Sequence, residues 1–470
     1  MPSDIVKQLD PIFKAKSVAV IGASREPFKW GGRTLLTIIL SGYSGEIYPV
    51  NPKEKEIAKL PCYPSVRDIP YDVDMAVIVV PAAVAPRAMA DCVAKRVGGV
   101  VMITAGFAEA SEEGKVLQDE LVRIAREGGI RFVGPNGMGM YSSAVKLNLC
   151  LNETLLPGKI AFVSQSGTFG GLLADFAERK GYGLSKFISI GNQADLNAAD
   201  YVEYLGEDDD TGAIVLYMEG FKDGDRFFRI AREVIKKKPI LMYKAGRTEA
   251  AARAAMSHTS SLAGSDEIVD AMCRQVGIIR TTEVTHPFDM AEALIGLPLP
   301  KGNRVAIIGS GGQGVVTSDT CELLGLRVPA LDHETSMRIK ETLPPHAPIP
   351  KNPVDFAGGM RGPLDEVKVA EALAQTDYID GIICNTPHFH GDDNSDEVKT
   401  AVQGAKIVAD IPEKYGKPVV TLSWHSHGGG AIGDIMKEAG IPSYETPEQC
   451  ARAMMALVQY AEVRRKLAED

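Results

Sequence analysis

The chain has 470 residues, a formal net charge of −10 and a hydrophobic content of 45%, which predicts a soluble protein of two to four domains. The negative charge argues against a nucleic-acid surface, because phosphate backbones are bound by basic fields. Its seven cysteines are scattered without a CxxC pair, which argues against a disulfide framework or a zinc knuckle and indicates a reducing compartment. No signal core is found, and no apolar run approaches the ~18 residues of a membrane span. We therefore expect a cytoplasmic protein that does not bind membranes.

Residues 1–150 contain repeated apolar runs that end in small or polar residues. These runs are SVAVIGAS (17–24), EIYPVN (46–51), MAVIVVP (75–81), GVVMITAGF (99–107) and IRFVGPNG (130–137). They predict a Rossmann-like α/β domain with a parallel sheet. Ligands bind at the carboxyl ends of such strands. The candidate binding residues at these ends are Gly22, Ala23, Ser24, Asn51, Pro52, Lys53, Pro81, Thr104, Ala105, Gly106 and Asn136.

The first turn and the second strand end argue against NAD as the nucleotide. The turn reads GASREPFKWGG rather than GxGxxG, and Lys53 follows the strand where a dinucleotide binder places an acid. A lysine suits a phosphorylated ribose, and coenzyme A carries both a 3′-phosphate and a diphosphate. The sequence therefore favours CoA, with a nucleotide-binding fold that holds no ligand as the alternative.

A second α/β block, 151–298, contains four predicted strands, KIAFVS, LSKFISIGNQ, GAIVLYMEG and KPILMYKAG, which indicate a flavodoxin-like parallel sheet. The first strand runs into Ser164, Gln165, Ser166 and Gly167 before a helix. Backbone N–H groups at such a helix start form a phosphate site, although SQSG is also compatible with simple N-capping. The third strand ends at Glu219, which should face the site.

His258 lies in a segment of small residues, 245–264, between a buried strand and a helix capped by Ser265. Small side chains favour an exposed, mobile connection, so an ordinary linker histidine is one interpretation. The other is a phosphohistidine. A neutral imidazole attacks phosphorus with one ring nitrogen when a carboxylate such as Glu219 holds the proton on the other.

The third block, 299–470, is predicted to be a second flavodoxin-like domain after a linker that follows Glu283. It opens with a strand, then GSGGQG, then a helix, so Gly311, Gly312, Gln313 and Gly314 form a second predicted phosphate site. Two such helix starts suggest that one phosphoryl group is held from both sides. Segment 350–359 is predicted to be a loop ending near Asp355, and a last helix should start at Thr446.

These motifs in this order resemble the alpha subunit of the NDP-forming acyl-CoA synthetases, the ADP-forming acetate–CoA ligase group, over nearly the whole chain. The first two domains also look like the succinyl-CoA synthetase alpha subunit. The resemblance implies that His258 is phosphorylated, that Glu219 steadies it, and that the two helix starts hold the phosphate. It implies an acyl or substrate pocket near Asn136 and Thr168.

The resemblance also implies a partner. No ATP-grasp domain is recognisable in these residues, so a separate beta subunit should bind ATP or ADP with Mg²⁺, in an α2β2 assembly. The implied reaction interconverts acyl-CoA, phosphate and ADP with a carboxylic acid, CoA and ATP. The sequence leaves open the identity of the acid and the physiological direction. Alternatives are a CoA or acyl-CoA binding regulator without turnover and, less favoured, a NAD-dependent enzyme.

One feature departs from the family pattern. The pairs His388 and His390, and His425 and His427, hold four of the eight histidines and follow predicted strands. Alternate residues of an extended segment share a side, so a transition-metal site is conceivable. No cysteine or carboxylate spacing supports it, so no metal ligand is assigned, and a role in binding the acid, an interface or ordinary polar strand tips are preferred.

Overall fold

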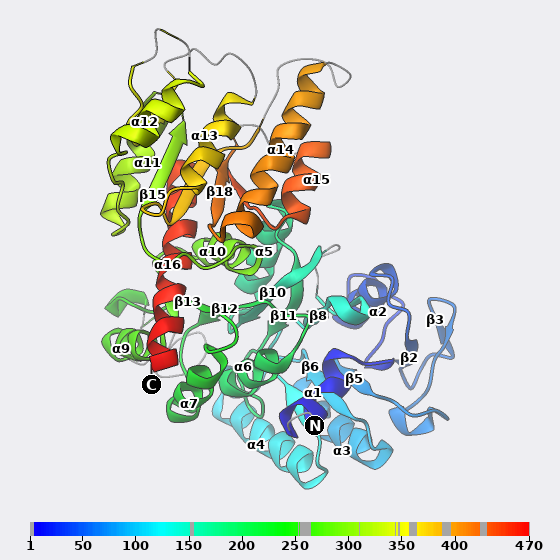
Figure 1. Ribbon diagram of the computed structural model, residues 1–470. Coiled ribbons are helices and arrows are strands. Elements are labelled where there is room, and N and C mark those ends of the chain that lie inside the picture. Colours follow the sequence, from blue (N-terminus) through cyan, green and yellow to red (C-terminus); the bar gives the residue numbers. More distant parts are fainter. Residues whose placement is uncertain are drawn as a thin grey trace. The chain divides into compact units, whose positions relative to one another are not determined.

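The structure is a computed structural model that describes residues 4–150, 155–251, 253, 265–309, 311–343, 345, 348–356, 364–387, 396–423 and 430–469. The chain forms two compact units, Met1–Thr285 and His286–Asp470, which are described separately (Figure 1). The division into domains at 1–150, 151–298 and 299–470 remains a prediction.

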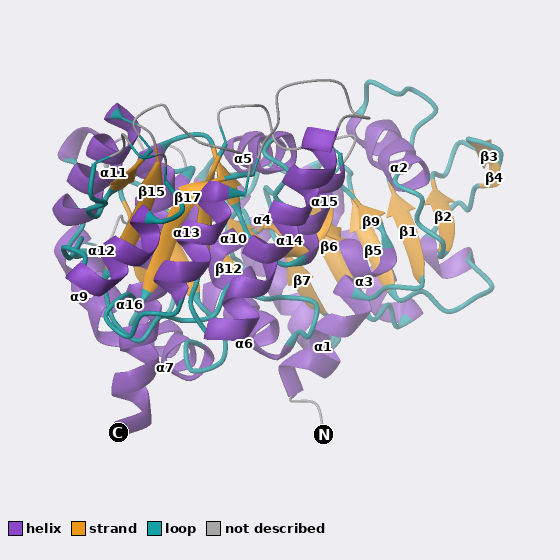
Figure 2. Cartoon of the chain, turned by 45° about the horizontal axis from the view of Figure 1, so that its top comes forward, coloured by secondary structure: helices purple, strands orange, loops and turns teal. Residues whose placement is uncertain are grey.

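The first sheet is parallel, with five strands in the order β2-β1-β5-β6-β7, and Figure 2 shows these strands in a row. Its strands are β1 (Ser17–Ile21), β2 (Glu46–Val50), β5 (Met75–Ile78), β6 (Gly99–Met102) and β7 (Arg131–Val133). The helices are α1 (Asp4–Phe13), α2 (Trp30–Leu40), α3 (Ala85–Lys95) and α4 (Glu112–Glu127), and a short hairpin is formed by β3 (Glu56–Ile57) and β4 (Leu60–Pro61). All five strands predicted from the sequence are confirmed.

Continuous apolar runs form these strands because both faces of the sheet are covered. Every residue of β1, β5 and β6 is buried, so the strands lack the alternation of a half-exposed sheet. Helices α3 and α4 pack against each other, and α1 contacts β6. Helix α4 begins where the Ser111 hydroxyl accepts a hydrogen bond from the Gly114 N–H at 3.1 Å. The covered strands leave only their ends for binding.

The second sheet has seven strands in the order β14-β13-β12-β10-β11-β8-β9. Its strands are β8 (Met140–Ser142), β9 (Leu147–Asn148), β10 (Pro157–Ser164), β11 (Leu184–Ser189), β12 (Ala213–Met218), β13 (Ile240–Lys244) and β14 (Ile279–Thr281). The four predicted strands are β10 to β13, but four was too few. A fifth parallel strand, β14, extends one edge, and β8 pairs antiparallel with β11 on the other.

The helices of this sheet are α5 (Gly167–Arg179), α6 (Ala198–Glu207), α7 (Gly224–Val234) and α9 (Asp266–Val276). Ser265 caps α9, as predicted, by accepting a hydrogen bond from the Ile268 N–H at 3.4 Å. Asn197 and Asp200 form a reciprocal capping box at the start of α6. Helices α6 and α7 contact each other, as do α7 and α9. These caps fix where each helix starts after a strand.

The second unit contains a parallel sheet in the order β16-β15-β17-β18-β19. Its strands are β15 (Val305–Gly309), β16 (Val354–Asp355), β17 (Gly381–Asn385), β18 (Val419–Leu422) and β19 (Ser443–Tyr444). Its helices are α10 (His286–Gly296), α11 (Gly312–Leu323), α12 (His333–Lys340), α13 (Asp365–Ala374), α14 (Asp396–Tyr415), α15 (Ala431–Glu438) and α16 (Pro447–Glu469). The last helix is confirmed. The loop predicted at 350–359 contains strand β16, so Asp355 ends a strand.

Helix α10 packs within the second unit. It contacts α16, and the Tyr444 hydroxyl donates a hydrogen bond to the Asp289 carbonyl at 2.6 Å. A Cβ on Gly296 would lie 2.0 Å from the Gly440 carbonyl oxygen, so the backbones touch there. The segment after Glu283, which the sequence marks as the approach to a linker, thus forms a packed helix.

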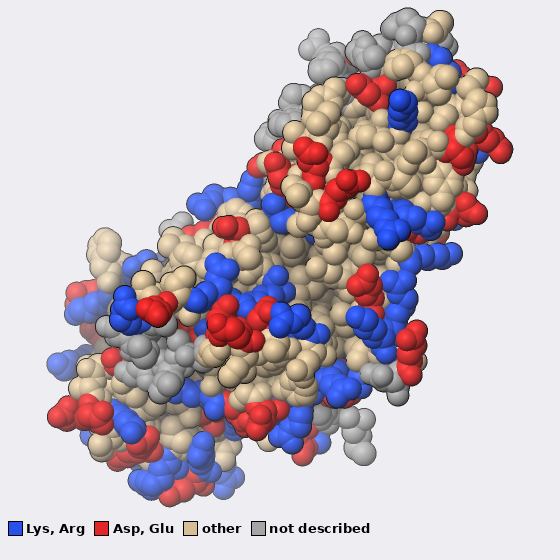
Figure 3. Space-filling view, turned by 90° about the vertical axis from the view of Figure 1, so that its left-hand side faces the viewer, with Lys and Arg blue, Asp and Glu red and all other residues tan. Residues whose placement is uncertain are grey.

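The surface carries charges of both signs. Figure 3 shows acidic and basic side chains interspersed on one face. The exposed ion pair Arg123–Glu127 lies within α4, and the pair Lys236–Glu233 joins the last turn of α7 to the turn that follows it. Exposed pairs of this kind contribute less than ~1 kcal/mol each, so burial rather than surface charge holds the fold. Among the described helices, none combines the length and apolar character needed to span a bilayer.

Candidate active site

A cavity of about 520 Å³ in the first unit joins the carboxyl ends of the first sheet to the start of α5. It brings together eight of the predicted site residues: Pro81, Thr104, Ala105, Asn136, Gln165, Ser166, Gly167 and Thr168. The size is within the range of small-molecule sites. Some of the residues predicted to bind CoA and phosphate, and both residues predicted to contact the acyl group, therefore line one cavity within this unit.

Close packing at two glycines forms one wall of the cavity. A Cβ on Gly137 would lie 2.7 Å from the Ser189 carbonyl oxygen, and a Cβ on Gly167 would lie 2.7 Å from the Met138 Cγ. The Ser189 hydroxyl accepts a hydrogen bond from the Met138 N–H at 2.8 Å. Only glycine allows this approach, which sets the end of the first sheet directly beside the α5 start.

The remaining predicted CoA residues lie outside the cavity lining. Gly22 has a φ of +96°, and a Cβ added to it would lie 2.4 Å from the Val79 carbonyl oxygen. The first turn therefore needs glycine at this position. The Asn51 side-chain amide donates to the Ala23 carbonyl at 2.8 Å, so Asn51 ties the second strand end to the first turn. Lys53 is exposed at the same edge. Like Ala23, Ser24, Pro52 and Gly106, these residues follow strand ends of the first sheet but do not line the cavity.

A polar network beside Asn136 includes a residue that the sequence did not single out. The Asn192 side-chain nitrogen donates to Glu109 at 2.5 Å and to Gln118 at 3.0 Å, and its oxygen accepts from the Asn136 amide at 3.3 Å. Burial works to raise the pKa of the Glu109 carboxyl, but hydrogen bonds from Asn192 and from backbone N–H groups outweigh it and hold that pKa below its usual value. An ionised Glu109 thereby fixes the amides of Asn192 and Asn136 at the cavity.

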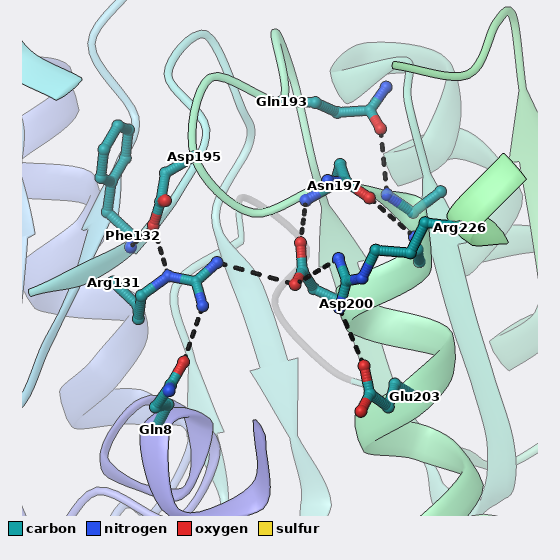
Figure 4. Close-up of polar contacts among 11 residues, drawn as sticks. Gln8, Arg131, Phe132, Gln193, Asp195, Asn197, Asp200, Glu203 and Arg226 are labelled. Carbon is teal, nitrogen blue, oxygen red and sulfur yellow. Dashed lines mark hydrogen bonds and ion pairs between the residues drawn. The ribbon is translucent and has the colours of Figure 1, made fainter. Parts of the chain in front are cut away.

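The loop from Ile190 to Asn197, between β11 and α6, also binds the first sheet on the side of a second hollow (Figure 4). Asp195 accepts from the Arg131 Nε at 2.9 Å and from the Phe132 N–H at 3.0 Å. Asp200 lies 3.6 Å from the Arg131 Nη2 and accepts from Arg226 at 2.8 Å. One loop thus lines both hollows and holds the two sheets of this unit together.

The start of α5 is open. Its N-cap residue, Ser166, makes no side-chain capping hydrogen bond, so the first N–H groups of the helix face the cavity without that partner. The alternative of simple N-capping by SQSG is therefore not supported. The Ser164 hydroxyl instead donates to the Ser166 carbonyl at 2.7 Å and shapes the turn. A helix start of this kind favours an anion.

Gln165 connects this helix start to Glu219. Its side-chain oxygen accepts hydrogen bonds from the backbone N–H groups of Glu219 at 2.9 Å and Gly220 at 3.1 Å. Glu219 is 8% exposed and follows β12 directly, as the sequence predicts. The oxygen of Gln165 therefore holds the strand end in place, rather than facing a ligand.

Two further polar side chains lie near Glu219. Burial and then the Glu219 carboxylate raise the pKa of Tyr217 to about 12. Burial lowers the pKa of Lys244, whose charge interacts favourably with Asp266 and Glu219. Lys244 ends β13 with no exposed surface, and its ammonium group donates to the Ala245 carbonyl. The sequence offers a signal for Lys244 only in its position at a strand end.

The second unit has a similar open start at α11. Its N-cap is Gly311, at φ +53°, and makes no side-chain cap. A Cβ on Gly311 or Gly312 would meet no atom of the described residues within 4 Å. Gln313 and Gly314 continue the first turn. The predicted second phosphate residues thus form an accessible helix start within this unit.

Two protein families match successive parts of this chain. Residues 16–143 match the CoA binding domain family, and residues 157–294 match the succinyl-CoA ligase like flavodoxin domain. The chain is 41% identical over 457 residues to the alpha subunit of acetate–CoA ligase [ADP-forming] II of Pyrococcus furiosus, which covers 96% of this chain and 98% of the relative. The chain belongs to the ADP-forming acetate–CoA ligase family.

Other members of the ligase family are similar along the whole chain. Acetate–CoA ligase [ADP-forming] I of Archaeoglobus fulgidus is 37% identical over 97% of this chain, which covers 64% of that longer relative. The solved acetyl-coenzyme A synthetase 1 of Ca. Korarchaeum cryptofilum, in complex with phosphate and ADP, has a TM-score of 0.85 at 34% identity and covers 98% of both chains. The resemblance and the α/β fold class are confirmed, and the regulator without turnover is not favoured.

Some predicted residues lie outside the described part of the chain. These are His258 and the pairs His388 and His390, and His425 and His427. The cavity also includes residues that the sequence did not single out. Gly191 and Asn192 come just after strand β11, so they could have been predicted from the rule that ligands bind at the carboxyl ends of parallel strands. For Trp30, the only signal in the sequence was its position in the unusual first turn.

Proposed function

We propose that this ligase subunit converts acyl-CoA and phosphate to an acyl phosphate and CoA, and passes the phosphoryl group to His258. The observation that supports it is the single cavity shared by strand ends of the CoA-binding domain, Asn136 and the open start of α5. A thioester carbonyl and a phosphate are thereby accommodated in one hollow, as an attack of one on the other requires.

The reaction is proposed to proceed in three transfers, in each of which one bond forms as another breaks. A phosphate oxygen attacks the thioester carbonyl, the carbon–sulfur bond breaks, and CoA leaves as a thiolate that takes up a proton. The imidazole of His258 then attacks phosphorus, the bond to the acyl oxygen breaks, and the free carboxylate leaves. Finally ADP accepts the phosphoryl group from the histidine. The helix start at Ser166 and Gly167 stabilises the phosphoryl oxygens, because backbone N–H groups are oriented there before the reaction.

We assign Glu219 the role of holding the proton on the second ring nitrogen of His258. A carboxylate acceptor fixes the tautomer and favours the cationic ring that forms on phosphorylation. Gln165 supports this role because it holds the backbone of Glu219 and Gly220 through two hydrogen bonds. Thr168 and Asn136, which line the same cavity, are proposed to contact the acyl group.

The nucleotide is proposed to bind to a separate ATP-grasp beta subunit, with Mg²⁺, in an α2β2 assembly. The Pyrococcus furiosus relative is named a subunit alpha, which supports a partner. We propose that His258 moves between the two subunits during the reaction. We infer a cytoplasmic location, because all seven cysteines are free and buried, as in proteins of reducing compartments.

The decisive experiment is phosphoryl labelling. With the partner subunit, labelled ATP and Mg²⁺, we expect an acid-labile, base-stable label on the wild-type chain and none on His258→Ala. Retention of CoA binding by His258→Ala is the control for folding. An unlabelled wild-type chain that still binds CoA would overturn the proposal and favour a regulator.

The acid is best identified by a screen. Acetate is the first candidate because the two Pyrococcus furiosus relatives are named for it. Branched and aryl acids should be compared with it at equal concentration, with CoA thioester formation by the reconstituted subunits as the measurement. If Asn136 and Thr168 select the acid, the enzyme's kcat/KM for that acid should fall when either residue is replaced by alanine.

A further inference from the structure

Glu366 is a buried carboxyl group close to the second helix start, and the proposed reaction does not use it. It lies in the first turn of α13 and is 8% exposed. Its Oε1 accepts a hydrogen bond from the Asn385 backbone N–H at 2.9 Å, and the Asn385 side chain also favours the ionised carboxyl group and so lowers its pKa against the effect of burial. Carboxylates that are buried at this cost usually hold a defined polar partner.

Asn385 connects Glu366 to Gln313. Figure 2 shows β17, which ends at Asn385, beside β15, which leads to the α11 start. The Gln313 Nε2 donates to the Asn385 Oδ1 at 2.6 Å. The side chain of Gln313 also packs over Gly309, where a Cβ would lie 3.0 Å from Nε2. Asn385 therefore contacts both Glu366 and Gln313, and this connection ends at the predicted phosphate residues.

An ionised Glu366 determines which side-chain atom Asn385 and Gln313 each turn towards its neighbour. An ionised carboxyl group only accepts, so Asn385 must turn its Nδ2 towards Glu366 and its Oδ1 towards Gln313. Gln313 must then present Nε2 to Asn385. An amide nitrogen carries two N–H groups, which leaves one to donate to a phosphoryl oxygen. If the amide were reversed, an oxygen lone pair would occupy that position and repel the anion.

The first unit uses the same placement. Gln165 follows β10 and reaches the end of the neighbouring strand β12, at Glu219, just as Gln313 follows β15 and reaches the end of β17. The two glutamines differ in which amide atom they use. In the first unit the Gln165 side-chain oxygen accepts from two backbone N–H groups. In the second, the Gln313 side-chain nitrogen donates to Asn385, whose orientation depends on the Glu366 carboxylate.

We propose that Glu366 and Asn385 are positioning residues that orient the Gln313 amide for phosphate at the α11 start. The proposal rests on the proposed function for its phosphate ligand. Among the described residues that interact electrostatically with Glu366, the titratable one is the Cys384 thiol of β17, and burial and then Glu366 raise the pKa of that thiol. Burial raises the pKa of Glu366 itself to about 7, so the tests belong near pH 8, where it is ionised.

A pair of substitutions tests the direction of the bonds. In Glu366→Gln the new amide can donate to Asn385, which reverses Asn385 and Gln313 without changing their size. In Asn385→Asp two carboxyl groups face each other. The double variant restores the order, because the amide introduced at position 366 would donate to the carboxylate introduced at position 385, and that carboxylate would again accept from Gln313. We expect the KM for phosphate to rise about five- to tenfold in each single variant and to return within about twofold of wild type in the double.

A second readout does not depend on turnover. The rise in Tm that inorganic phosphate causes in the full-length chain, each variant measured against its own phosphate-free baseline, should shrink in the single variants and return in the double. Glu371→Gln is the matched control, since Glu371 lies on the same helix and pairs with exposed Lys414, and it should leave both measurements unchanged.

The outcomes separate this inference from the proposed function. A wild-type chain that phosphate stabilises but that shows no turnover with its partner would refute the proposed function, while the rescue of phosphate stabilisation would still support the roles of Glu366 and Asn385. A turning-over enzyme in which Glu366→Gln equals wild type, or in which the double variant is no better than the worse single one, overturns the inference alone. An absent effect of phosphate on the wild-type Tm also overturns it.

Discussion

Gln165 shows how one side chain can be interpreted in two ways. Its position after β10 places it among the predicted phosphate ligands, yet its side-chain oxygen accepts from the N–H groups of Glu219 and Gly220. It is also 5% exposed. The residue therefore links the phosphate site to the strand end that carries the proposed proton acceptor.

We expect Gln165→Leu to destabilise the first unit by about 2 kcal/mol, because two buried N–H groups lose their acceptor. Gln165→Glu keeps an acceptor oxygen but adds a negative charge beside Glu219, so it should retain more stability and yet lower the yield of phosphohistidine. Thermal unfolding and phosphoryl labelling measure the two effects. Equal losses of labelling and stability in both variants would argue that Gln165 only supports packing.

Glu366 should make stability depend on pH. Its pKa is raised from 4.5 to about 7 in the folded chain, so the unfolded chain loses the proton first as pH rises. The folded state is therefore relatively most stable below about pH 4.5 and loses up to about 3 kcal/mol as pH rises through 7. The Tm of wild type minus that of Glu366→Gln should fall between pH 5 and pH 8. A difference independent of pH would contradict the raised pKa.

At the scale of elements, the loop between β11 and α6 matters most. Asn192 at one end borders the cavity, and Asp195 at the other binds Arg131. The loop also makes backbone hydrogen bonds to the first sheet, from Asn192 to Pro135 and from Ala194 to Gly134. Its position is set by both sheets, so it is the element that keeps their facing ends at a fixed distance.

Arg131→Ala should weaken this connection. Asp195 and Asp200, at 6% and 4% side-chain exposure, would each lose a cationic neighbour. We expect a loss of about 1–3 kcal/mol and weaker CoA binding, measured by thermal unfolding and calorimetric titration. Arg123→Ala is the matched control, because Arg123 pairs with Glu127 on the exposed side of α4 and should cost under ~0.5 kcal/mol. Similar losses in both variants would contradict a special role for Arg131.

At the scale of the whole molecule, the two compact units meet in sequence between Thr285 and His286. Helix α10 follows that point at once and contacts α16, with Asp289 accepting from both Tyr444 and Gln449. The predicted domain boundary at 298/299 instead separates α10 from those partners. The contacts favour a folding unit that includes the helix.

We therefore expect residues 286–470 to unfold cooperatively when expressed alone, and residues 299–470 to unfold at a lower temperature. Removal of α10 exposes the surface of α16 that it covers and removes the Asp289 carbonyl, which accepts a hydrogen bond from the Tyr444 hydroxyl. Circular dichroism melts of the two fragments measure this. An equal Tm for both would support the boundary at 298/299.

Much of the fold was predictable from the sequence because parallel strands buried on both faces are continuous apolar runs, as in β1, β5 and β12. The hairpin of β8 and β9 was missed, since strands of three and two residues show no period. The helix starts at Ser166 and Gly311 were predictable because they follow strands, and their role in phosphate binding stays a prediction. Glu366 was not, because it starts a helix and reaches its partner only through tertiary packing.

The open start of α5 also limits what the site can distinguish. If phosphate binds at this start as proposed, the backbone N–H groups contact its oxygens and do not distinguish the atom at its centre. Arsenate should therefore replace phosphate, and the mixed anhydride it forms with the acyl group hydrolyses in water. With arsenate the protein would then hydrolyse acyl-CoA to the free acid and CoA without forming a nucleoside triphosphate, because the site recognises the shape of the anion and not its central atom.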